Sequence, residues 1–293
     1  MAFRRFRQRR FGRRKGYRPT RRKAGFRSRK PRRRTTRMSA KRVRFITARK
    51  KFDTRVGSVD AATAPTSLKY VAGSTYILSC PTHLDSQVTG DTRYERAQQE
   101  IFFRGVKERI FISAKLHVTW RRIVFFSHDR FVVGMPILVD PPTIQPRYFR
   151  RNLAPFSPQA EGVNSAMGEY LWQGTLGIDY SEDDRAFSRL DAQRVKIISD
   201  RSININPNYN METQSYGKNF TASRWHPVNR KITYDQDESG SVKSDPNGWA
   251  TRSTTNPGNI YIMDILYNGE QLVPPQPEAG TIRIQSTVYW HER

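Results

Sequence analysis

The stretch that decides the fold is IFFRGVKERIFISAKLHVTWRRIVFF, residues 101–126. Its apolar side chains recur at every second position, and this set consists of Val106, Ile110, Ile112, Ala114, Leu116, Val118, Trp120, Val124 and Phe126. The polar side chains fall mostly on the alternate positions; they are Glu108, Lys115, His117, Thr119 and Arg121. A period of two is typical of strands with one buried face, whereas a helix would repeat every 3.6 residues. The stretch is long enough for two strands.

Further strand candidates lie on both sides of this stretch. They are residues 75–80 (TYILSC), 131–140, 170–172, 176–180, 195–205 (one strand, or two with a bend at Asp200), 231–234 (KITY), 259–267 (NIYIMDILY) and 281–290. Residues 53–75 are interpreted as a linker into the first strand. Only one short helix is expected, over residues 181–190, with Ser181 as its cap. The sequence therefore predicts an all-β protein built as an antiparallel sandwich or barrel, with the jelly roll among the leading options.

The first 51 residues differ in composition from the rest. They hold 25 Lys or Arg and no Asp or Glu. The whole chain has 52 Lys+Arg and 26 Asp+Glu, so residues 52–293 contain 27 basic and 26 acidic side chains, a net charge of +1. Because a block of like charge repels itself, we expect residues 1–51 to form an arm that stays disordered until an anion binds. Residues 52–293 are long enough to bury a core of their own.

Arginine dominates the basic side chains of the arm, and its planar fork donates paired hydrogen bonds to phosphate. Phe3, Phe6, Phe11, Tyr17, Phe26 and Phe45 are interleaved with the basic residues and could stack on unpaired bases. The arm is therefore predicted to bind single-stranded nucleic acid. The expected binding residues are Arg4, Arg5, Arg7, Arg9, Arg10, Arg13, Arg14, Lys15, Arg18, Arg21, Arg22, Lys23, Arg27, Arg29, Lys30, Arg32, Arg33, Arg34 and Arg37.

Two basic clusters of the arm, residues 29–34 (RKPRRR) and 41–44 (KRVR), also have the composition of nuclear-import signals. The expected import residues are Arg29, Lys30, Arg32, Arg33, Arg34, Lys41, Arg42 and Arg44. Binding to a membrane surface is an alternative for the same clusters. A solubilising tail is a further alternative, but it would need neither so many arginines nor the aromatic side chains between them.

The remaining residues, 52–293, carry no recognisable catalytic signature. They lack a phosphate-binding loop, a G-x-S-x-G element and an H-E-x-x-H motif. The five histidines are scattered; they are His83, His117, His128, His226 and His291. The single cysteine, Cys80, cannot form an intrachain disulfide or a multi-cysteine zinc site. We therefore expect no enzymatic activity, no cofactor and no metal.

Two acidic clusters, residues 179–184 (DYSEDD) and 235–238 (DQDE), could hold a divalent cation at a subunit boundary or take part in acid–base chemistry. A helix start and a solvated loop explain them more simply. No apolar segment follows the basic amino terminus or approaches the length of a membrane helix, about 20 residues, so we expect neither a secretory signal nor a membrane span. The loops over residues 141–170 and 236–258 are candidates for outward-facing or contact surfaces.

Four segments carry a resemblance to a known family: residues 101–114 (IFFRGVKERIFISA), 226–240 (HPVNRKITYDQDESG), 259–267 (NIYIMDILY) and 281–293 (TIRIQSTVYWHER). Together with the Arg-rich arm, they resemble the capsid proteins of small circular single-stranded DNA viruses, closest to the genomovirus and geminivirus-like group. The resemblance covers the arm and about a third of the remaining chain. Geminivirus coat proteins carry a Cys/His cluster proposed to bind zinc, which Cys80 alone cannot supply, so the genomovirus side is favoured.

The resemblance implies that residues 52–293 form an eight-stranded antiparallel jelly-roll domain that assembles with copies of itself into an icosahedral shell. It also implies that the arm faces inward onto a single-stranded circular DNA genome, and that the protein enters the host nucleus by way of import receptors. A cellular basic nucleic-acid-binding protein, of ribosomal or chromatin type, is the main alternative. An enzyme with a basic targeting tail, such as a nuclease, ranks behind it because neither acidic cluster has a recognisable metal-ligand spacing.

Overall fold

A computed structural model describes residues 46–61, 65–84, 94–139, 148–156, 167, 170–181, 183–211, 215–235, 238–239, 242–243, 248–269 and 278–292. Nearly all of the regular structure is β-strand. Most of the loop over residues 141–170, and much of the loop over residues 236–258, lie outside the described residues. The expectation that these loops form contact surfaces therefore stays a prediction.

The larger of the two main sheets contains eight strands. They are β1 (Arg49–Ser58), β2 (Leu68–Val71), β4 (Glu100–Ala114), β6 (Ile137–Val139), β7 (Tyr148–Asn152), β10 (Asn208–Asn210), β11 (Ser215–Thr233) and β15 (Glu278–Glu292). Their order across the sheet is β10-β11-β4-β15-β1-β7-β6, and β2 pairs with the start of β15. All neighbours are antiparallel except β1 and β7, which pair in parallel.

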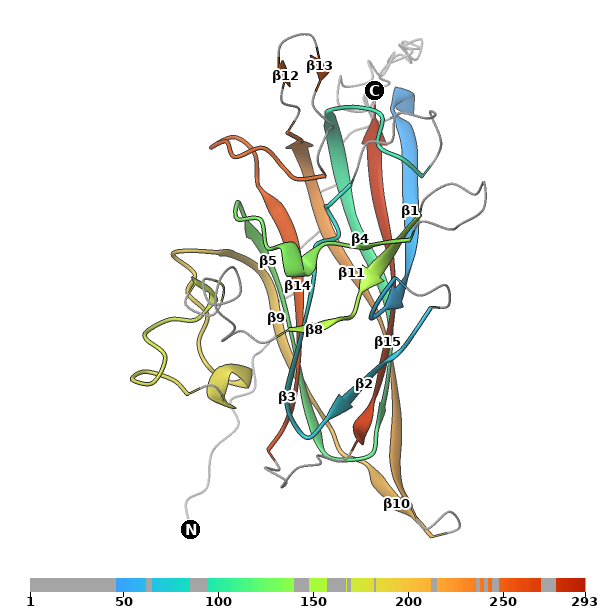
Figure 1. The fold of residues 1–293 in the computed structure, drawn as a ribbon, viewed down its shortest axis with the longest axis vertical. Coiled ribbons are helices and arrows are strands. Elements are labelled where there is room, and N and C mark those ends of the chain that lie inside the picture. The colour runs from blue at the N-terminus through green and yellow to red at the C-terminus, as the bar shows by residue number, and fades with distance from the viewer. Residues whose placement is uncertain are drawn as a thin grey trace, which may run out of the picture. The chain divides into compact units, whose positions relative to one another are not determined.

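The smaller main sheet contains β3 (Gly73–Ser79), β5 (Val118–Ser127), β8 (Pro155–Phe156), β9 (Lys196–Ile205) and β14 (Asn259–Asn268). Its order is β8-β3-β14-β5-β9, antiparallel throughout. Two 3-10 turns, η1 (Val132–Gly134) and η2 (Asp183–Ala186), and a small hairpin of β12 (Glu238–Ser239) and β13 (Val242–Lys243) complete the described elements. Figure 1 shows the long strands of the two sheets facing each other. The all-β prediction is confirmed, and the architecture is an antiparallel sandwich.

The alternating stretch over residues 101–126 forms two strands, β4 and β5, as predicted, but they belong to different sheets. From Val106 onward, the even-numbered side chains of both strands belong to the packing between the sheets. The expected polar face of the second strand is wrong, because β5 is buried on both faces. Residues 170–195 supply the second cover through Leu171, Trp172, Tyr180, Leu190 and Val195.

Two apolar clusters fill the space between the sheets. The first is built around Ile110, Ile112, Val118, Trp120, Ile205, Leu266, Ile282 and Ile284. The second is built around Phe103, Val106, Val124, Phe126, Ile232, Ile260, Ile262, Val288 and Trp290. In β4, β5, β14 and β15 alike, the residues of one cluster give way to those of the other at a single polar position. That position is Glu108, Arg122, Asp264 and Ser286, respectively.

We call Glu108, Arg122, Arg151 and Asp264 the charge layer, because these buried side chains separate the two apolar clusters. Arg122 pairs with both oxygens of Asp264, at 2.8 and 3.0 Å, and its Nη1 lies 2.9 Å from Glu108 Oε2. Arg151 bridges the same two carboxylates, donating to Glu108 at 3.0 Å and to Asp264 at 3.0 Å. Two cations therefore balance two anions across the sandwich.

The charge layer holds the Glu108 carboxylate ionised. Although burial by itself raises the pKa of Glu108, Arg122 and Arg151 outweigh it and lower that pKa to about 2. The Ser286 hydroxyl donates to Glu108 at 2.6 Å, and the Trp120 indole donates to Asp264 at 2.9 Å. Buried carboxylates that accept several such bonds are stable only as long as every partner is present.

Several predicted elements differ from the structure. Residues 131–140 form η1 and the three-residue β6 instead of one strand, because Gly134 and Pro136 interrupt the run. The helix expected over residues 181–190 is only the 3-10 turn η2, although Ser181 Oγ does accept the Asp184 N–H near its start. Residues 170–172 and 176–180 contribute isolated bridges instead of strands.

Several strands were not predicted, among them β1, β2 and most of β11. The supposed linker over residues 53–75 contains most of β1 and all of β2, and β1 already begins at Arg49, inside the stretch assigned to the arm. Its inward positions include the buried Lys51 and Arg55, so no apolar alternation marks it. Likewise, the polar β11 extends from Ser215, and the KITY segment ends this strand instead of opening one.

Candidate nucleic-acid interface

The binding and import residues expected from the sequence, Arg4 to Arg37 and Lys41 to Arg44, all lie outside the described residues. The structure therefore brings none of them together and separates none of them. What it adds is a surface that the sequence did not predict, on the outer face of the eight-stranded sheet. We define this surface by β1, β4, β11 and β15, because their outward side chains form a continuous row from one strand to the next.

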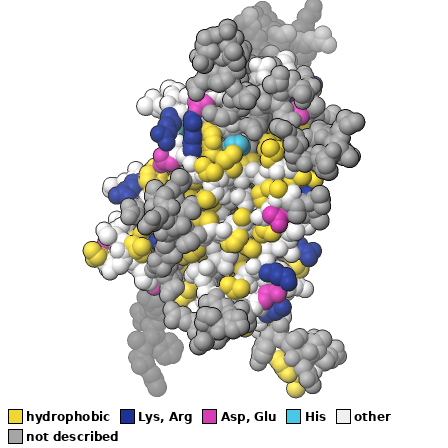
Figure 2. All heavy atoms as spheres, in the orientation of Figure 1, with side chains coloured by type: hydrophobic (Ala, Val, Ile, Leu, Met, Phe, Trp, Pro, Cys, Tyr) yellow, Lys and Arg dark blue, Asp and Glu magenta, His cyan; other side chains and the backbone are white. Residues whose placement is uncertain are grey.

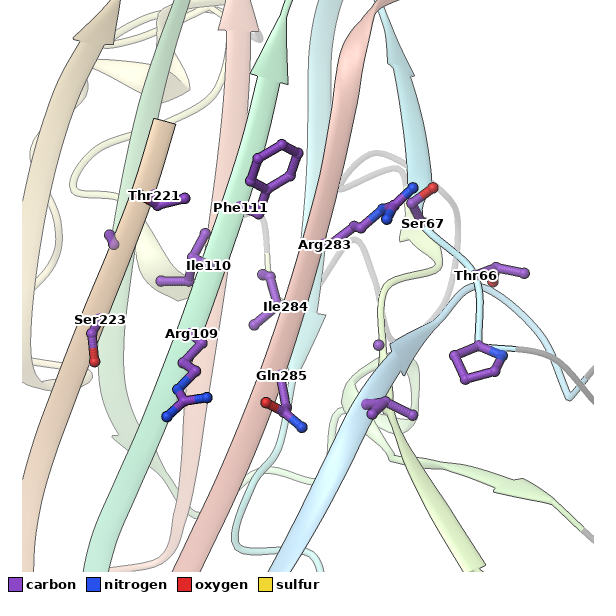
Figure 3. Close-up of a pocket in the computed structure, with 14 residues that line it drawn as sticks. Thr66, Ser67, Arg109, Ile110, Phe111, Thr221, Ser223, Arg283, Ile284 and Gln285 are labelled. Atoms are coloured by element: carbon purple, nitrogen blue, oxygen red, sulfur yellow. The ribbon is translucent and has the colours of Figure 1, made fainter. Parts of the chain in front are cut away.

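A groove of about 890 Å³ lies on this face, which we call the basic groove. Arg109 projects into it from β4, and Arg283 and Gln285 project from β15 (Figure 3). Thr221 and Ser223 of β11 line one side of it, and Figure 3 places Thr66 and Ser67, which precede β2, on the other side. The groove thus offers two guanidinium groups together with hydroxyl and amide groups that can donate or accept hydrogen bonds.

Neither Arg109 nor Arg283 forms an ion pair or a side-chain hydrogen bond with another described residue, and both are exposed. Elsewhere on the described surface, cations are often matched, as Lys69 and Lys115 are by Glu278 and Lys231 is by Glu100. On the face shown in Figure 2, several groups of Lys and Arg likewise lie beside acidic side chains. The two arginines of the basic groove have no such acidic partner among the described residues, so this groove can attract an external anion.

An aromatic row continues the same face beyond the basic groove. Trp225 of β11 contacts Tyr289 of β15, with ring centroids 5.8 Å apart, and Phe52 of β1 lies 6.3 Å from Tyr289 on the other side. Tyr94 meets Phe52 edge-on at 5.5 Å. Trp225 and Tyr94 are 47% and 58% exposed, so their rings remain open to a stacking partner. The exposed Lys107 is in register with Trp225 across the sheet.

This arrangement combines free guanidinium groups with exposed aromatic rings on one sheet face. Surfaces of this composition bind single-stranded nucleic acid, because the cations neutralise the backbone and any base can stack on an aromatic ring. The sequence did not predict this surface, because its residues come from four strands, of which β1 was not predicted and β11 only at its KITY end. The alternation in β4, which places Lys107, Arg109 and Phe111 on the outward positions, and that in β15, which places Arg283, Gln285 and Tyr289 on one face, were partial signals.

The titratable residues singled out from the sequence occupy separate places. Cys80 is buried, and burial raises the pKa of its thiol to about 11. His83 is buried against Trp249, with ring centroids 4.8 Å apart. His117 is exposed, whereas His226 contributes to the packing beside the charge layer. No cluster of three or more His, Cys, Asp or Glu with the geometry of a metal site occurs among the described residues.

The acidic clusters serve local structure where they are described. Asp179 accepts a hydrogen bond from the Thr175 N–H, and Asp184 accepts one from the Ser181 hydroxyl. Asp235 pairs with Arg130. Within the part of the chain that the structure covers, no helix is long and apolar enough to cross a membrane.

No protein-family model matches the sequence, and no curated protein matches it. Among solved structures, the chain is similar to Merkel cell polyomavirus VP1 in complex with GD1a oligosaccharide, at 8% identity and a TM-score of 0.11, covering 82% of this chain and 77% of that one. The unassembled VP1 pentamer of the same virus gives 9% identity and a TM-score of 0.10, over 83% and 77% of the two chains. These similarities are too weak to show the fold, which follows from the chain's own strand order.

Proposed function

We propose that this chain is a viral capsid protein that assembles with copies of itself into an icosahedral shell and packages single-stranded circular DNA. Its role in this proposal is structural and not catalytic. The observation that carries the proposal is the nested pairing of eight long strands. The first of these strands pairs with the eighth (β1 with β15), the second with the seventh (β3 with β14), the third with the sixth (β4 with β11) and the fourth with the fifth (β5 with β9).

This nested pairing supports an eight-stranded jelly roll, since it folds one long antiparallel ribbon over itself into two facing sheets. The jelly roll is an architecture of viral capsid proteins, although lectin domains and cupins use it as well. The fold alone therefore does not select the function. The charge distribution favours the capsid function over these others. A polycationic arm is joined to a nearly neutral remainder, so one chain can both form the shell and neutralise the phosphates of the genome.

The arm supplies the genome-binding half of the proposal. It carries 25 basic and no acidic side chains over residues 1–51. If sixty copies form one shell, their arms bring on the order of 1,500 positive charges, which can offset a comparable number of phosphates. The basic groove and the aromatic row offer a second, weaker contact for the same strand. The import clusters at residues 29–34 and 41–44 support delivery to the host nucleus through import receptors.

The test is to express the full chain and to examine the purified product by electron microscopy and nuclease digestion. Uniform closed particles that protect single-stranded DNA from nuclease are the expected result. A product that stays monomeric over a range of salt and protein concentrations, and yet binds nucleic acid, would favour the cellular nucleic-acid-binding alternative. DNA cleavage that depends on a divalent cation would overturn the structural role.

A further inference from the structure

A second hollow, of about 350 Å³, lies at one open edge of the sandwich, between β9 of the smaller sheet and β11 of the larger one. We call it the edge pocket. Arg122 and His226 line it on the side of the charge layer, and Arg201 and Arg224 line it from β9 and β11. Ile198 and Ile203 provide apolar surface beside them. The pocket is distinct from the basic groove, although the two adjoin along β11 and share Ser223 as a lining residue.

The edge pocket has an excess of positive charge. The charge layer is balanced, because Arg122 and Arg151 are matched by Glu108 and Asp264. Arg201 and Arg224 come in addition, and neither forms an ion pair or a side-chain hydrogen bond with another described residue.

The register of the sheets makes this excess unfavourable for the protein alone. Arg201 stands directly opposite Arg122 in the antiparallel pairing of β9 and β5. Like charges that face each other on one side of a sheet destabilise it. An anion between them would turn this repulsion into attraction.

One buried nitrogen at the back of the pocket also lacks a hydrogen-bond partner among the described residues. His226 Nε2 is 4.0 Å from Glu108 Oε2, too far for a hydrogen bond, whereas Arg122 Nη1 keeps its ion pair with that oxygen at 2.9 Å. The His226 side chain is more than nine-tenths buried. A buried polar atom without a hydrogen-bond partner is costly, so a ligand that reaches it and supplies that partner binds favourably.

From these observations we propose that the edge pocket binds the phosphate group of a nucleotide. Arg201 and Arg224 would contact the phosphate from two opposing sheets, with Arg122 and His226 behind it, and the apolar side chains would contact the attached sugar and base. Donors that converge from several directions suit a tetrahedral oxyanion better than a planar carboxylate. The pocket volume, about 350 Å³, is at the lower end of the range for small-molecule sites, about 300–1,000 Å³. This volume exceeds what a bare phosphate needs.

This inference is separate from the proposed packaging role, because it concerns the folded part of the chain and not the arm. Its ligand bridges the two sheets, so binding should resist their separation. A ligand that binds only the folded state raises the melting temperature. The melting temperature therefore reports on this pocket even in the full chain, whose arm also attracts phosphates.

The experiment measures the melting temperature of the full chain at constant ionic strength, in chloride alone and with 10 mM inorganic phosphate, 10 mM thymidine monophosphate or an oligo-dT of eight nucleotides. The expected rise with the mononucleotide is about 3 °C. The double variant Arg201→Ala/Arg224→Ala should lose this rise while melting in chloride no lower than the native chain, because it removes like-charge repulsion. The matched control Arg189→Ala/Lys218→Ala removes two exposed charges elsewhere and should keep the full rise.

The ligands distinguish the sources of the phosphate. A rise with the oligonucleotide that the double variant abolishes assigns the pocket to the strand, and a rise with the mononucleotide alone assigns it to free nucleotides. An equal rise in the native chain and in the double variant would overturn the proposal. An oligo-glutamate peptide is tested as a further ligand in the same buffer, and a rise produced only by this peptide would also overturn the proposal, because the site would then be one for carboxylates. Whether the chain forms particles has no bearing on any of these outcomes.

Discussion

At the scale of single residues, the charge layer is the feature with the largest energetic consequence. Glu108 sits on the inward positions of β4, in line with Val106 and Ile110, yet it carries a charge. Its carboxylate is stabilised by Arg122, Arg151 and Ser286. Removing one member of such a network leaves its partners charged and buried, which costs more than the lost contact itself.

We therefore expect Glu108→Gln to lower the free energy of unfolding by about 3–5 kcal/mol. The matched control is Glu100→Gln in the same strand, whose exposed pair with Lys231 contributes only about 0.2–1 kcal/mol. Urea unfolding followed by tryptophan fluorescence measures both. If the two variants lose similar amounts, the charge layer is not the stabilising network described above.

His83 predicts a pH dependence of stability. Burial, followed by the nearby Arg55 and Arg96, lowers the pKa of His83 from 6.5 to about 3. In the unfolded chain the residue takes up a proton as the pH falls below about 6.5, while in the folded chain it stays neutral. Stability is therefore complete above pH 6.5 and declines toward pH 3, by up to about 1.4 kcal/mol per pH unit for one proton.

The substitution His83→Gln should flatten this slope between pH 6.5 and about 5.5, a window that lies above the unfolded-state pKa of Glu108, 4.5, near which the contribution of Glu108 begins to be lost. Urea unfolding at half-unit pH steps provides the measurement. Some slope remains, because the pKa of His226 is also lowered by burial. An unchanged slope in the variant would mean that His83 is not buried as a neutral imidazole.

At the scale of elements, the contact between β4 and β11 depends on one glycine. Gly105 has φ of +153°, at a bulge where the register of β4 shifts, and a Cβ there would press on the His226 carbonyl oxygen and the Trp225 ring. We expect Gly105→Ala to cost about 1–3 kcal/mol of stability. Gly217→Ala is the control, since nothing lies within 4 Å of its Cβ position. Equal unfolding midpoints for the two variants would contradict this role for Gly105.

The outer face of the eight-stranded sheet yields a prediction for binding. The variant Arg109→Ala/Arg283→Ala should weaken binding of oligo-dT by the full chain and reduce the slope of log K against log salt by about 1.4, or about 0.7 per lost phosphate contact. Arg189→Ala/Lys196→Ala removes two exposed charges away from this face and should leave the slope nearly unchanged. Fluorescence anisotropy titrations between 50 and 400 mM salt, roughly the range over which such contacts are screened, provide the measurement. Equal slopes for both variants would remove the basic groove from the interface.

At the scale of the whole molecule, the division between arm and sandwich does not fall where the charge changes. The basic composition ends at Lys51, but Lys51 is part of β1, and its ammonium group lies 2.8 Å from the buried Glu292 carboxylate. The three basic residues Arg49 to Lys51 thus belong to the sheet. A truncation that follows the charge boundary would remove the start of β1.

We expect deletion of residues 2–45 to leave the unfolding free energy unchanged while abolishing packaging and tight DNA binding. Deletion of residues 2–51 should destabilise the fold by about 3–5 kcal/mol, because Glu292 is then buried without its cation. Circular dichroism and urea unfolding distinguish the two truncations, and nuclease protection reports on packaging. If the shorter deletion still packages DNA at physiological salt, the arm is not the main genome-binding element.

The amino-acid sequence was sufficient to predict the β class, the strands within residues 101–126, 259–267 and 281–290, and the separation of charge. These are properties of local order: a period of two in side-chain polarity, and a run of like charge that needs no partner in the chain to be recognised. Strands with polar inward positions, such as β1 and most of β11, were not predicted because they show no apolar alternation. Their side chains are buried by residues of neighbouring strands.

Which polar side chains lie next to one another depends on how the two sheets pack, and the sequence did not predict it. Glu108, Arg122, Arg151 and Asp264 are scattered along the chain and become a balanced network only when two sheets face each other. In the same way, Arg201 of β9 and Arg224 of β11 form an excess of positive charge only because the fold places both in one pocket. The physical reason is that a charge is stabilised or destabilised by its neighbours in space, at distances of a few ångströms, and the sequence records only its neighbours along the chain.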